Sequence, residues 1–471
     1  MKKIILILLL FGPVCLLSQP GLEKTFSLQE IRQDLSFFIK TVEHVHPNPY
    51  HSIRKENFYA LRDSMLAGMK DQVACGDAWL FFNRLMAAFD EGHSTIGYPS
   101  EIEQDIRDEK VKIFPVLVGD YNGKGIRVRY DLSSESLMKP GDLITAINGK
   151  SVREIMEHLK LFFGGLPSWR TVQIQRDFAA LMLITGFRPP YHIEFEQAGE
   201  KKKTEVEGVS LSKLQERAAA ARKQAPAQSG AVPYRFERSP ENSGYILFRS
   251  MRDLPAFEKF LDSVFSDIKI KPINGLIIDL RQNGGGNSVL GERLISYISS
   301  KPYRMGGGSR WKVSDEYKSF LREQAGSNAV YASGAFQHYL ELTTGEIISG
   351  NGGKPKSPGK NNLRYTGKVA VLTGPNTFSS ANMLSNAIKD FGLATIIGEP
   401  TGEPCNDYGE LYWTRLPHTG FLMYTCSKQF IRANGDADDP YPVFPDIEVK
   451  QDPDSRQDDV LEYARKWVSN R

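Results

Sequence analysis

The sequence predicts a multidomain protein of mixed α/β class, with a helical segment, a β-rich segment and a final segment in which strands and helices alternate. Three observations support this order. Apolar residues recur at helical spacing up to about residue 88 and alternate at strand spacing from about residue 113. After residue 234 they form short continuous runs, as in buried parallel strands. The 471 residues, 41% hydrophobic and 24% charged, are enough for two to four folded domains.

Residues 1–18 have the pattern of a secretory signal peptide. Two lysines precede an apolar run from Ile4 to Leu17, and Ser18 provides a small residue for cleavage. The run is shorter than the roughly 20 apolar residues that cross a bilayer. We therefore expect an exported protein, periplasmic or extracellular. An uncleaved leader that anchors the chain in a membrane is the alternative.

Charge and cysteine content limit the binding partners, cofactors and disulfide bonds that this protein can have. The net charge is +3, from 59 basic and 56 acidic side chains, so the composition provides no attraction to nucleic acid or to anionic membranes. Beyond the leader, Cys75, Cys405 and Cys426 are too few for a disulfide framework, although a Cys405–Cys426 pair stays open. No Cys/His spacing is typical of structural zinc, and we expect no metal or organic cofactor.

Residues 19–105 are predicted to form a helical cap. Ser27 and Glu30 have the S-x-x-E spacing of a capping box and precede an amphipathic run. Two further runs at helical spacing lead into the loop D-E-G-H-S, residues 90–94, which carries His93.

Residues 106–208 are predicted to be β-rich. Asn148-Gly149 is a strong hairpin signal, and a helical pattern follows from Val152 to Phe163. The order P-G-D-x-I-x-x-I-N-G-K-x-V around this hairpin resembles PDZ domains, which capture peptide C-termini by adding a strand to a sheet edge. An insert that has the shape of a PDZ domain and binds nothing is the alternative.

Residues 209–232 are rich in Ala, Lys and Gln, so we expect a solvated linker or a mobile helix there. Residues 233–471 then alternate strands and helices, with apolar strands at 275–281, 368–374 and 394–400. This order predicts an open, largely parallel sheet with crossover helices.

Two strand-to-helix junctions in that segment carry the candidate chemistry. The first, residues 279–287, reads D-L-R-Q-N-G-G-G-N. Its glycines, Gly285 and Gly286 among them, allow a close backbone approach and leave N–H groups that suit an oxyanion. A tight turn without a ligand is the alternative. A phosphate loop is not indicated, because no G-x-x-x-x-G-K-[ST] is present.

The second junction, residues 373–382, reads T-G-P-N-T-F-S-S-A-N. A serine here projects from the carboxyl edge of the sheet, where α/β proteins place their sites. Ser379 is the candidate nucleophile, and the N–H of Ser380 would complete an oxyanion hole. Taken alone, the pattern fits a simple helix N-cap better than a nucleophile.

A serine nucleophile needs a base, and the chain has eight histidines. His44, His46 and His51 belong to the H-P-N-P-Y-H turn region, which we expect them to structure. His93 differs because it lies on a loop and follows Asp90-Glu91-Gly92. A lone loop histidine is still weak evidence for catalysis.

Taken together, these segments resemble the tail-specific (C-terminal processing) serine peptidases, with the tricorn protease core and the repeats of interphotoreceptor retinoid-binding protein. The family's D-x-R-x-N-x-G-G falls on residues 279–286, and its T/S-A-S-A-S-E falls on residues 377–382 with the serine at Ser379. The resemblance covers nearly the whole mature chain. It implies a crotonase-like (ClpP-like) α/β peptidase core and a polypeptide substrate.

One departure decides the choice of base. Members with a Ser–Lys dyad read G-E-P-T-F-G-K-G, whereas residues 398–405 read G-E-P-T-G-E-P-C, with Pro404 in the lysine position. The tricorn-like branch uses a histidine from the front of the chain, which here is His93. The resemblance places the orienting acid at Asp439, before P-D-I-E, with Glu410 as a rival and Ser94 as a further orienting group. A solvated turn is the alternative for both acids.

These features predict an exported serine endopeptidase that hydrolyses unfolded or C-terminal segments of proteins through an acyl-enzyme. The missing lysine and the altered serine motif leave a second hypothesis, an inactive ligand- or peptide-binding protein on the same scaffold. An acyl-CoA enzyme of crotonase type would share the glycine turn, but the sequence has no evident adenine or phosphate site.

Overall fold

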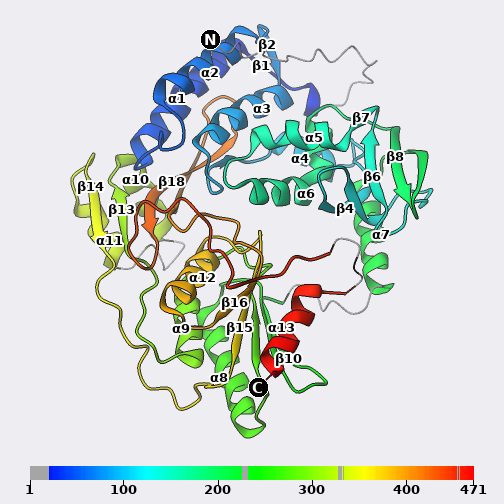
Figure 1. Ribbon diagram of the computed structural model, residues 1–471. Helices are drawn as coiled ribbons and strands as arrows, with labels where there is room; N and C mark the ends of the chain where they lie inside the picture. Colours follow the sequence, from blue (N-terminus) through cyan, green and yellow to red (C-terminus); the bar gives the residue numbers. More distant parts are fainter. Residues whose placement is uncertain are drawn as a thin grey trace, which may run out of the picture.

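The computed structural model describes residues 21–224, 232–326, 331, 334–452, 455 and 457–470. The predicted signal peptide, residues 1–18, lies outside the described residues. Within these ranges, no helix combines the length and apolarity needed to cross a membrane. Figure 1 shows the chain in two halves, with the N-terminal helices and an antiparallel sheet above and a helix-covered parallel sheet below.

The helical segment begins at the predicted capping box, which the structure confirms. The Ser27 hydroxyl accepts the N–H of Glu30, and the Glu30 carboxylate accepts the N–H of Ser27 at 2.7 Å. Short strands on either side of the first two helices pair with each other and close the segment. Its elements are β1 (Thr25–Ser27), α1 (Leu28–Val45), α2 (Lys55–Ala67), β2 (Gln72–Ala74), α3 (Cys75–Met86) and α4 (Ser100–Arg107).

The β-rich segment folds as an antiparallel sheet in the order β4-β5-β6-β8-β9, with β7 paired to β6. The predicted hairpin is confirmed, because Asn148 and Gly149 both have positive φ, 50° and 76°, as a tight two-residue turn requires. One continuous hydrophobic core joins this sheet to the helical cap. The elements are β4 (Val116–Tyr121), β5 (Ile126–Asp131), β6 (Leu143–Ile147), β7 (Lys150–Ser151), α5 (Val152–Leu159), α6 (Pro167–Ile184), β8 (Tyr191–Gln197) and β9 (Glu200–Val206).

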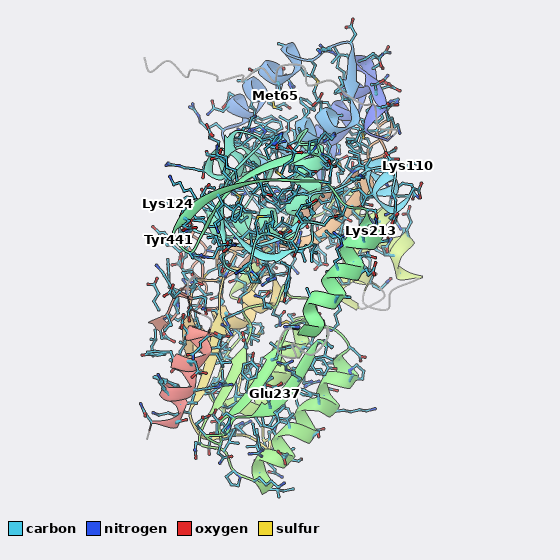
Figure 2. All side chains as sticks on the ribbon, turned by 90° about the vertical axis from the view of Figure 1, so that its right-hand side faces the viewer. Met65, Lys110, Lys124, Lys213, Glu237 and Tyr441 are labelled. Carbon is cyan, nitrogen blue, oxygen red and sulfur yellow. The ribbon has the colours of Figure 1, made fainter. Side chains whose placement is uncertain are left out.

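The connection to the lower half is helical where it is described. Helix α7 (Leu211–Gln224) starts beside the β-rich segment, where Arg217 donates to the carbonyl of Leu132 at 2.6 Å. In Figure 2 this helix, marked by Lys213, descends from the upper half towards the strand that carries Glu237.

The lower half is an α/β core, as predicted. Six strands follow the order β10-β11-β12-β15-β16-β19, with β10 antiparallel and the others parallel. Alternate residues face opposite sides, so Ile246 and Ile278 pack under α8, α9 and α12, whereas Leu247 and Ile277 pack against α13. The elements are β10 (Tyr234–Arg238), β11 (Gly244–Phe248), α8 (Leu254–Ile270), β12 (Leu276–Asp279), α9 (Val289–Ile298), β15 (Val369–Thr373), α12 (Ser380–Phe391), β16 (Thr395–Gly398), β19 (Ile447–Glu448) and α13 (Asp459–Ser469).

A further antiparallel sheet, here called the second sheet, connects the two halves. Its order is β14-β13-β18-β17, and β3 (Thr95–Ile96) from the front of the chain pairs with β18 through Ile96–Met423 and Thr95–Tyr424. The N–H of Gly97 extends this pairing by donating to the carbonyl of Leu422 at 2.7 Å. The elements around this sheet are β13 (Gly308–Lys312), α10 (Asp315–Ala325), α11 (Gly334–Glu341), β14 (Ile347–Asn351), β17 (Asp407–Arg415) and β18 (Leu422–Ile431).

The turn between β17 and β18 is fastened to α1 by a buried carboxylate. Asp34, which is fully buried, accepts the backbone N–H groups of His418 and Thr419 at 2.8 Å each. It also accepts the Thr419 hydroxyl at 2.7 Å. These bonds hold the β17–β18 hairpin against α1 of the helical segment.

Replacing Asp34 with Ala should weaken this fastening and lower the free energy of unfolding by about 3 kcal/mol, because buried donors lose a charged acceptor. Urea unfolding, followed by tryptophan fluorescence and by circular dichroism, measures the loss.

The matched control is Glu56→Ala, which removes an exposed acid from α2. Equal midpoints for the two variants would contradict the role given to Asp34.

Candidate active site

Ser379 lies in the predicted junction between β15 and α12, and its backbone is strained. Its φ and ψ are 54° and −128°, a conformation that non-glycine residues adopt only where the surroundings enforce it. Two bonds hold the chain just before Ser379: the N–H of Phe378 donates to the carbonyl of Asn283 at 3.0 Å, and the Thr377 hydroxyl donates to the carbonyl of Leu280 at 2.9 Å. The Ser379 side chain makes no capping hydrogen bond to α12, so the N-cap interpretation does not account for its hydroxyl.

The two junctions touch at the glycine turn. A Cβ placed on Gly285 would lie 2.7 Å from the Cβ of Ser379 and 2.8 Å from the nitrogen of Ser380, so only glycine fits there. The structure separates the two predicted donor glycines. The N–H of Gly285 donates to the Asn283 side chain at 2.9 Å, whereas the described hydrogen bonds give no acceptor to the N–H of Gly286 or of Ser380. Gly286 and Ser380 are therefore the pair available to an oxyanion.

His93 lies on the loop immediately before β3, close to the second junction. Its ring centroid is 4.6 Å from that of Phe378, the neighbour of Ser379, and its side chain is 13% exposed. The loop is held from the β-rich segment, where Arg170 forms an ion pair with Asp90. The pairing of β3 with β18 fixes the other end of the loop.

A residue that sequence reasoning missed, Glu403, joins the histidine to the serine. It lies on the loop between β16 and β17, and its side chain is 5% exposed. One carboxylate oxygen contacts Nδ1 of His93 at 2.8 Å, and the other accepts the backbone N–H of Ser379 at 2.7 Å. The available signal was its position directly before Pro404, next to the place of the missing lysine.

The contact with Glu403 sets the protonation of His93. Burial lowers the pKa of His93, but the charge of Glu403 and its hydrogen bond, with a smaller effect of Glu91, outweigh burial and raise the pKa above 6.5. With Nδ1 bound to Glu403, Nε2 is the nitrogen left to take a proton. The described contacts contain no direct hydrogen bond from the ring to the Ser379 hydroxyl, so the base and the hydroxyl must approach when substrate binds.

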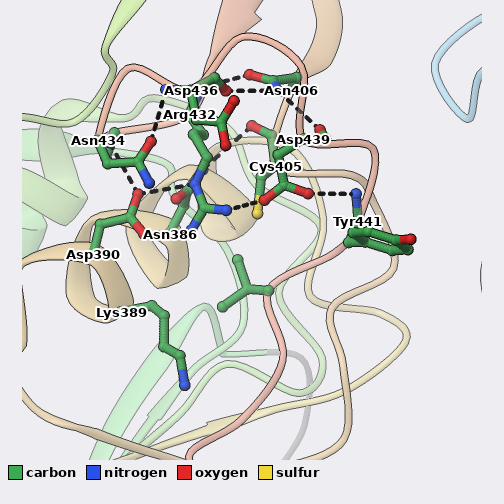
Figure 3. A network of polar contacts seen from close by, with 12 residues as sticks. Asn386, Lys389, Asp390, Cys405, Asn406, Arg432, Asn434, Asp436, Asp439 and Tyr441 are labelled. Carbon is green, nitrogen blue, oxygen red and sulfur yellow. Dashed lines mark hydrogen bonds and ion pairs between the residues drawn. The ribbon is translucent and has the colours of Figure 1, made fainter.

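The structure corrects the predictions for the orienting acid. Asp439 forms an ion pair with Arg432, which also binds Asp390, and accepts the N–H of Tyr441 at 2.9 Å (Figure 3). With these partners it does not hold His93. The physical reason is charge. The guanidinium of Arg432 forms ion pairs with both Asp390 and Asp439, so the Asp439 carboxylate is already paired with a cation.

Glu410 is placed elsewhere as well. It has a positive φ of 55° in an irregular part of β17, and its carboxylate accepts the Tyr317 hydroxyl at 3.4 Å. Burial raises the pKa of Glu410, since the attraction of Lys428 only partly offsets the lost hydration. Lys428 itself stacks on Trp311 at 4.3 Å, on the opposite side of β18 from Gln429, which lines the cavity beside the site.

Ser94 does not contact the imidazole of His93, contrary to the prediction. Its hydroxyl donates to the buried carboxylate of Glu91 at 2.8 Å. The same carboxylate binds Nε2 of His46 at 2.7 Å and Nε2 of His51 at 2.9 Å. Burial raises the pKa of Glu91, but the two histidines outweigh it and hold the pKa well below the usual range. The cluster of Glu91, Ser94, His46 and His51 therefore anchors the chain on both sides of the Gly92–His93 pair.

The Cys405–Cys426 pair that the sequence left open is not formed. Cys75, Cys405 and Cys426 are all free and buried. Cys405 packs in the core of the parallel sheet, whereas Cys426 faces the cap, with its sulfur 3.7 Å from the Ser94 hydroxyl. Burial raises the pKa of both thiols, which keeps them protonated.

A cavity of about 500 Å³ opens beside the site. One wall comes from the cap and the other from the loops that carry Glu403 and Asp439. Phe378 belongs to the lining, and the ring of Trp169 from α6 stacks on it with centroids 3.8 Å apart and an interplanar angle of 9°. The lining of the cavity includes Asn48, His51, Arg310, Phe378, Glu403, Asp407, Tyr408, Gln429 and Asp438.

A serine at a strained strand-to-helix turn, an imidazole–carboxylate pair and free backbone donors are the parts of an acyl-transfer site. Fold and site thus define an α/β serine hydrolase. Residues 242–449 match the family model described as Peptidase family S41. This matched segment carries both junctions and agrees with the tail-specific serine peptidase that the sequence motifs indicated.

Solved structures share the fold over almost the whole chain. Mature CPAF matches with a TM-score of 0.62 and 14% identity, covering 94% of this chain and 97% of that chain. A point mutant of CPAF matches with a TM-score of 0.65 and 12% identity, covering 94% and 96%. Mature CPAF complexed with lactacystin gives 0.62 and 14%, covering 94% and 98%. Among curated proteins, none matches this sequence.

Replacing Glu403 with Gln should change both the rate and its pH dependence. A base must be neutral, so a raised pKa of His93 moves the acidic limb of kcat/KM to higher pH. Gln removes the charge that raises this pKa, so the limb should move to lower pH while the maximal kcat/KM falls roughly 10²–10⁴-fold. A pH series with an unstructured fluorogenic peptide measures both effects.

Glu410→Gln is the matched control, because it changes another buried acid that does not contact His93. If the limb moves in the control and stays in the Glu403 variant, Glu403 does not orient the base.

Proposed function

We propose that this chain is an exported serine endopeptidase that hydrolyses unfolded or C-terminal segments of proteins through an acyl-enzyme. The observation that carries the proposal is the carboxylate of Glu403, which binds both the His93 ring and the backbone of Ser379. This bridge brings a base from the front of the chain beside a hydroxyl from its last quarter. The two free N–H donors come from the two junctions, Gly286 from the first and Ser380 from the second, and the Ser380 hydroxyl joins them by donating to the Gly286 carbonyl at 2.5 Å.

In the acylation step, Nε2 of His93 takes the proton of the Ser379 hydroxyl while the oxygen attacks the peptide carbonyl. The negative charge on the carbonyl oxygen is stabilised by the N–H groups of Gly286 and Ser380, and each such donor is worth about 2.7–4 kcal/mol in the barrier. Glu403 stabilises the imidazolium that forms. His93 then returns the proton to the leaving amine as the C–N bond breaks.

Deacylation repeats these roles with water. His93 takes a proton from the water molecule that attacks the ester carbonyl, and then protonates the Ser379 oxygen as the ester bond breaks. The strained backbone of Ser379 supports this cycle, because it directs the hydroxyl away from helix capping.

The substrate class follows from the β-rich segment and the cavity. The P-G-D-x-I-x-x-I-N-G-K-x-V pattern lies on β6 and β7 of an open antiparallel sheet, and an edge strand of such a sheet can pair with an extended peptide. Helix α6 of this segment contacts Phe378 through Trp169, which links the sheet physically to the nucleophile junction. Export is proposed from the leader pattern of residues 1–18.

Ser379→Ala should abolish hydrolysis of an unstructured peptide and labelling by a serine-directed phosphonate, while the melting temperature stays close to that of the wild type. Mass spectrometry of the labelled protein identifies the modified residue.

Ser380→Ala is the matched control at the same junction, because it keeps the backbone N–H and removes only a hydroxyl that donates to the carbonyl of Gly286. It should still be labelled at Ser379. A wild-type chain that binds peptides tightly but is neither labelled nor hydrolytic would instead be a binding protein on a peptidase scaffold.

A further inference from the structure

A second buried acid, Asp407, lies directly behind Glu403. It is the first residue of β17, it is 5% exposed, and it lines the same cavity of about 500 Å³ as Glu403. Its side chain lies within hydrogen-bonding reach of the Glu403 carboxylate, so a proton on either acid would join the two. Its Oδ1 atom is buried and receives no N–H or O–H from any residue that the structure describes.

Two carboxyl groups in such a space cannot both carry a charge, because each loses hydration and repels the other. The two oxygens of Glu403 already face His93 and the N–H of Ser379, so Glu403 is the member that is ionised. Asp407 has a hydrogen bond from its own backbone N–H, which lowers its pKa less than burial and Glu403 raise it, and its Oδ1 has no donor among the described residues. A proton on Asp407 removes the repulsion and also gives the pair the hydrogen bond that its oxygens otherwise lack.

No neighbouring cation among the described residues neutralises the second carboxylate in place of this proton. Arg310 on β13 donates to Gln429 at 3.3 Å, and Arg432 is taken by Asp390 and Asp439. Burial and then the charge of Glu403 raise the pKa of Asp407 well above its usual value. The other titratable groups that line the cavity or surround the pair are His51, Asp90, Glu91, His93, Cys405, Tyr408, Cys426 and Asp438.

We propose that Asp407 is a positioning residue that stays protonated at neutral pH and donates a hydrogen bond to Glu403. The bond restrains the carboxylate that holds both the His93 ring and the Ser379 amide, and it keeps the pair at a single negative charge. Asp407 acts on the reaction through Glu403 and not on the reacting atoms themselves. Its effect on turnover rests on the proposed function, whereas its protonation does not.

The first experiment needs no turnover and is done on the full mature chain with Ser379→Ala. Infrared spectra at neutral pH should contain the carbonyl band of a buried carboxylic acid, and Asp407→Asn should remove it. The folded pKa of Asp407 lies above the unfolded value of about 3.9, so its contribution to stability is lost as pH rises through the folded pKa. The melting temperature of Asp407→Asn should therefore gain on the parent as pH rises from about 4.

The second experiment measures kcat/KM against pH in the active chain. Asn can still donate to Glu403 and cannot ionise, so Asp407→Asn should retain kcat/KM within about 3-fold and lose the alkaline limb caused by Asp407. Asp407→Ala should lower kcat/KM by roughly 10-fold, which corresponds to one lost hydrogen bond. Asp438→Asn, an exposed acid of the same cavity, is the control and should change neither the band nor the limb.

An infrared band that persists in Asp407→Asn would overturn the proposal, as would an unchanged pH profile in that variant. Should Asp407→Ala not fold, the isosteric Asn variant carries the whole test. If the wild type proves inactive, the proposed function fails, and the infrared band and the pH-dependent melting still decide the protonation of Asp407.

Discussion

The pairing of β3 with β18 is the interaction on which the site depends. It joins only two residue pairs, yet it brings residue 95 next to residue 424 and holds the loop of His93 against the hairpin of the second sheet. The fastening of the same hairpin to Asp34 supports the pairing from the far side. A short pairing can be decisive here because the cap also buries its apolar face in one core with the β-rich segment.

Around this pairing the site is organised by two buried carboxylates with different tasks. Glu91 takes two histidines and a serine hydroxyl, and so fixes the chain just before His93. Glu403 binds the His93 ring and the Ser379 backbone N–H, and so ties the loop of the base to the turn of the nucleophile. Both acids are buried and both are paired, which is the condition under which buried charge is tolerated.

Sequence reasoning identified the elements and the two junctions well, because they depend on local patterns. The capping box at Ser27, the hairpin at Asn148 and the strands that precede the glycine turn and Ser379 all have short-range signatures. It failed for the acid on His93. Asp439 and Glu410 were chosen from their positions in the sequence. The contact with His93 depends instead on which carboxylate is not already paired with a cation, and Asp439 forms an ion pair with Arg432.

By itself, the sequence determined the mixed α/β class, the order of the segments, the serine at the turn and the glycines that face it. These follow from periodicity, propensity and backbone freedom, which act within a few residues. Only the tertiary structure decided that Glu403 holds His93, that Gly286 rather than Gly285 has a free N–H, and that the thiols stay apart. Those outcomes depend on burial and on competition between charged groups, which no linear spacing encodes.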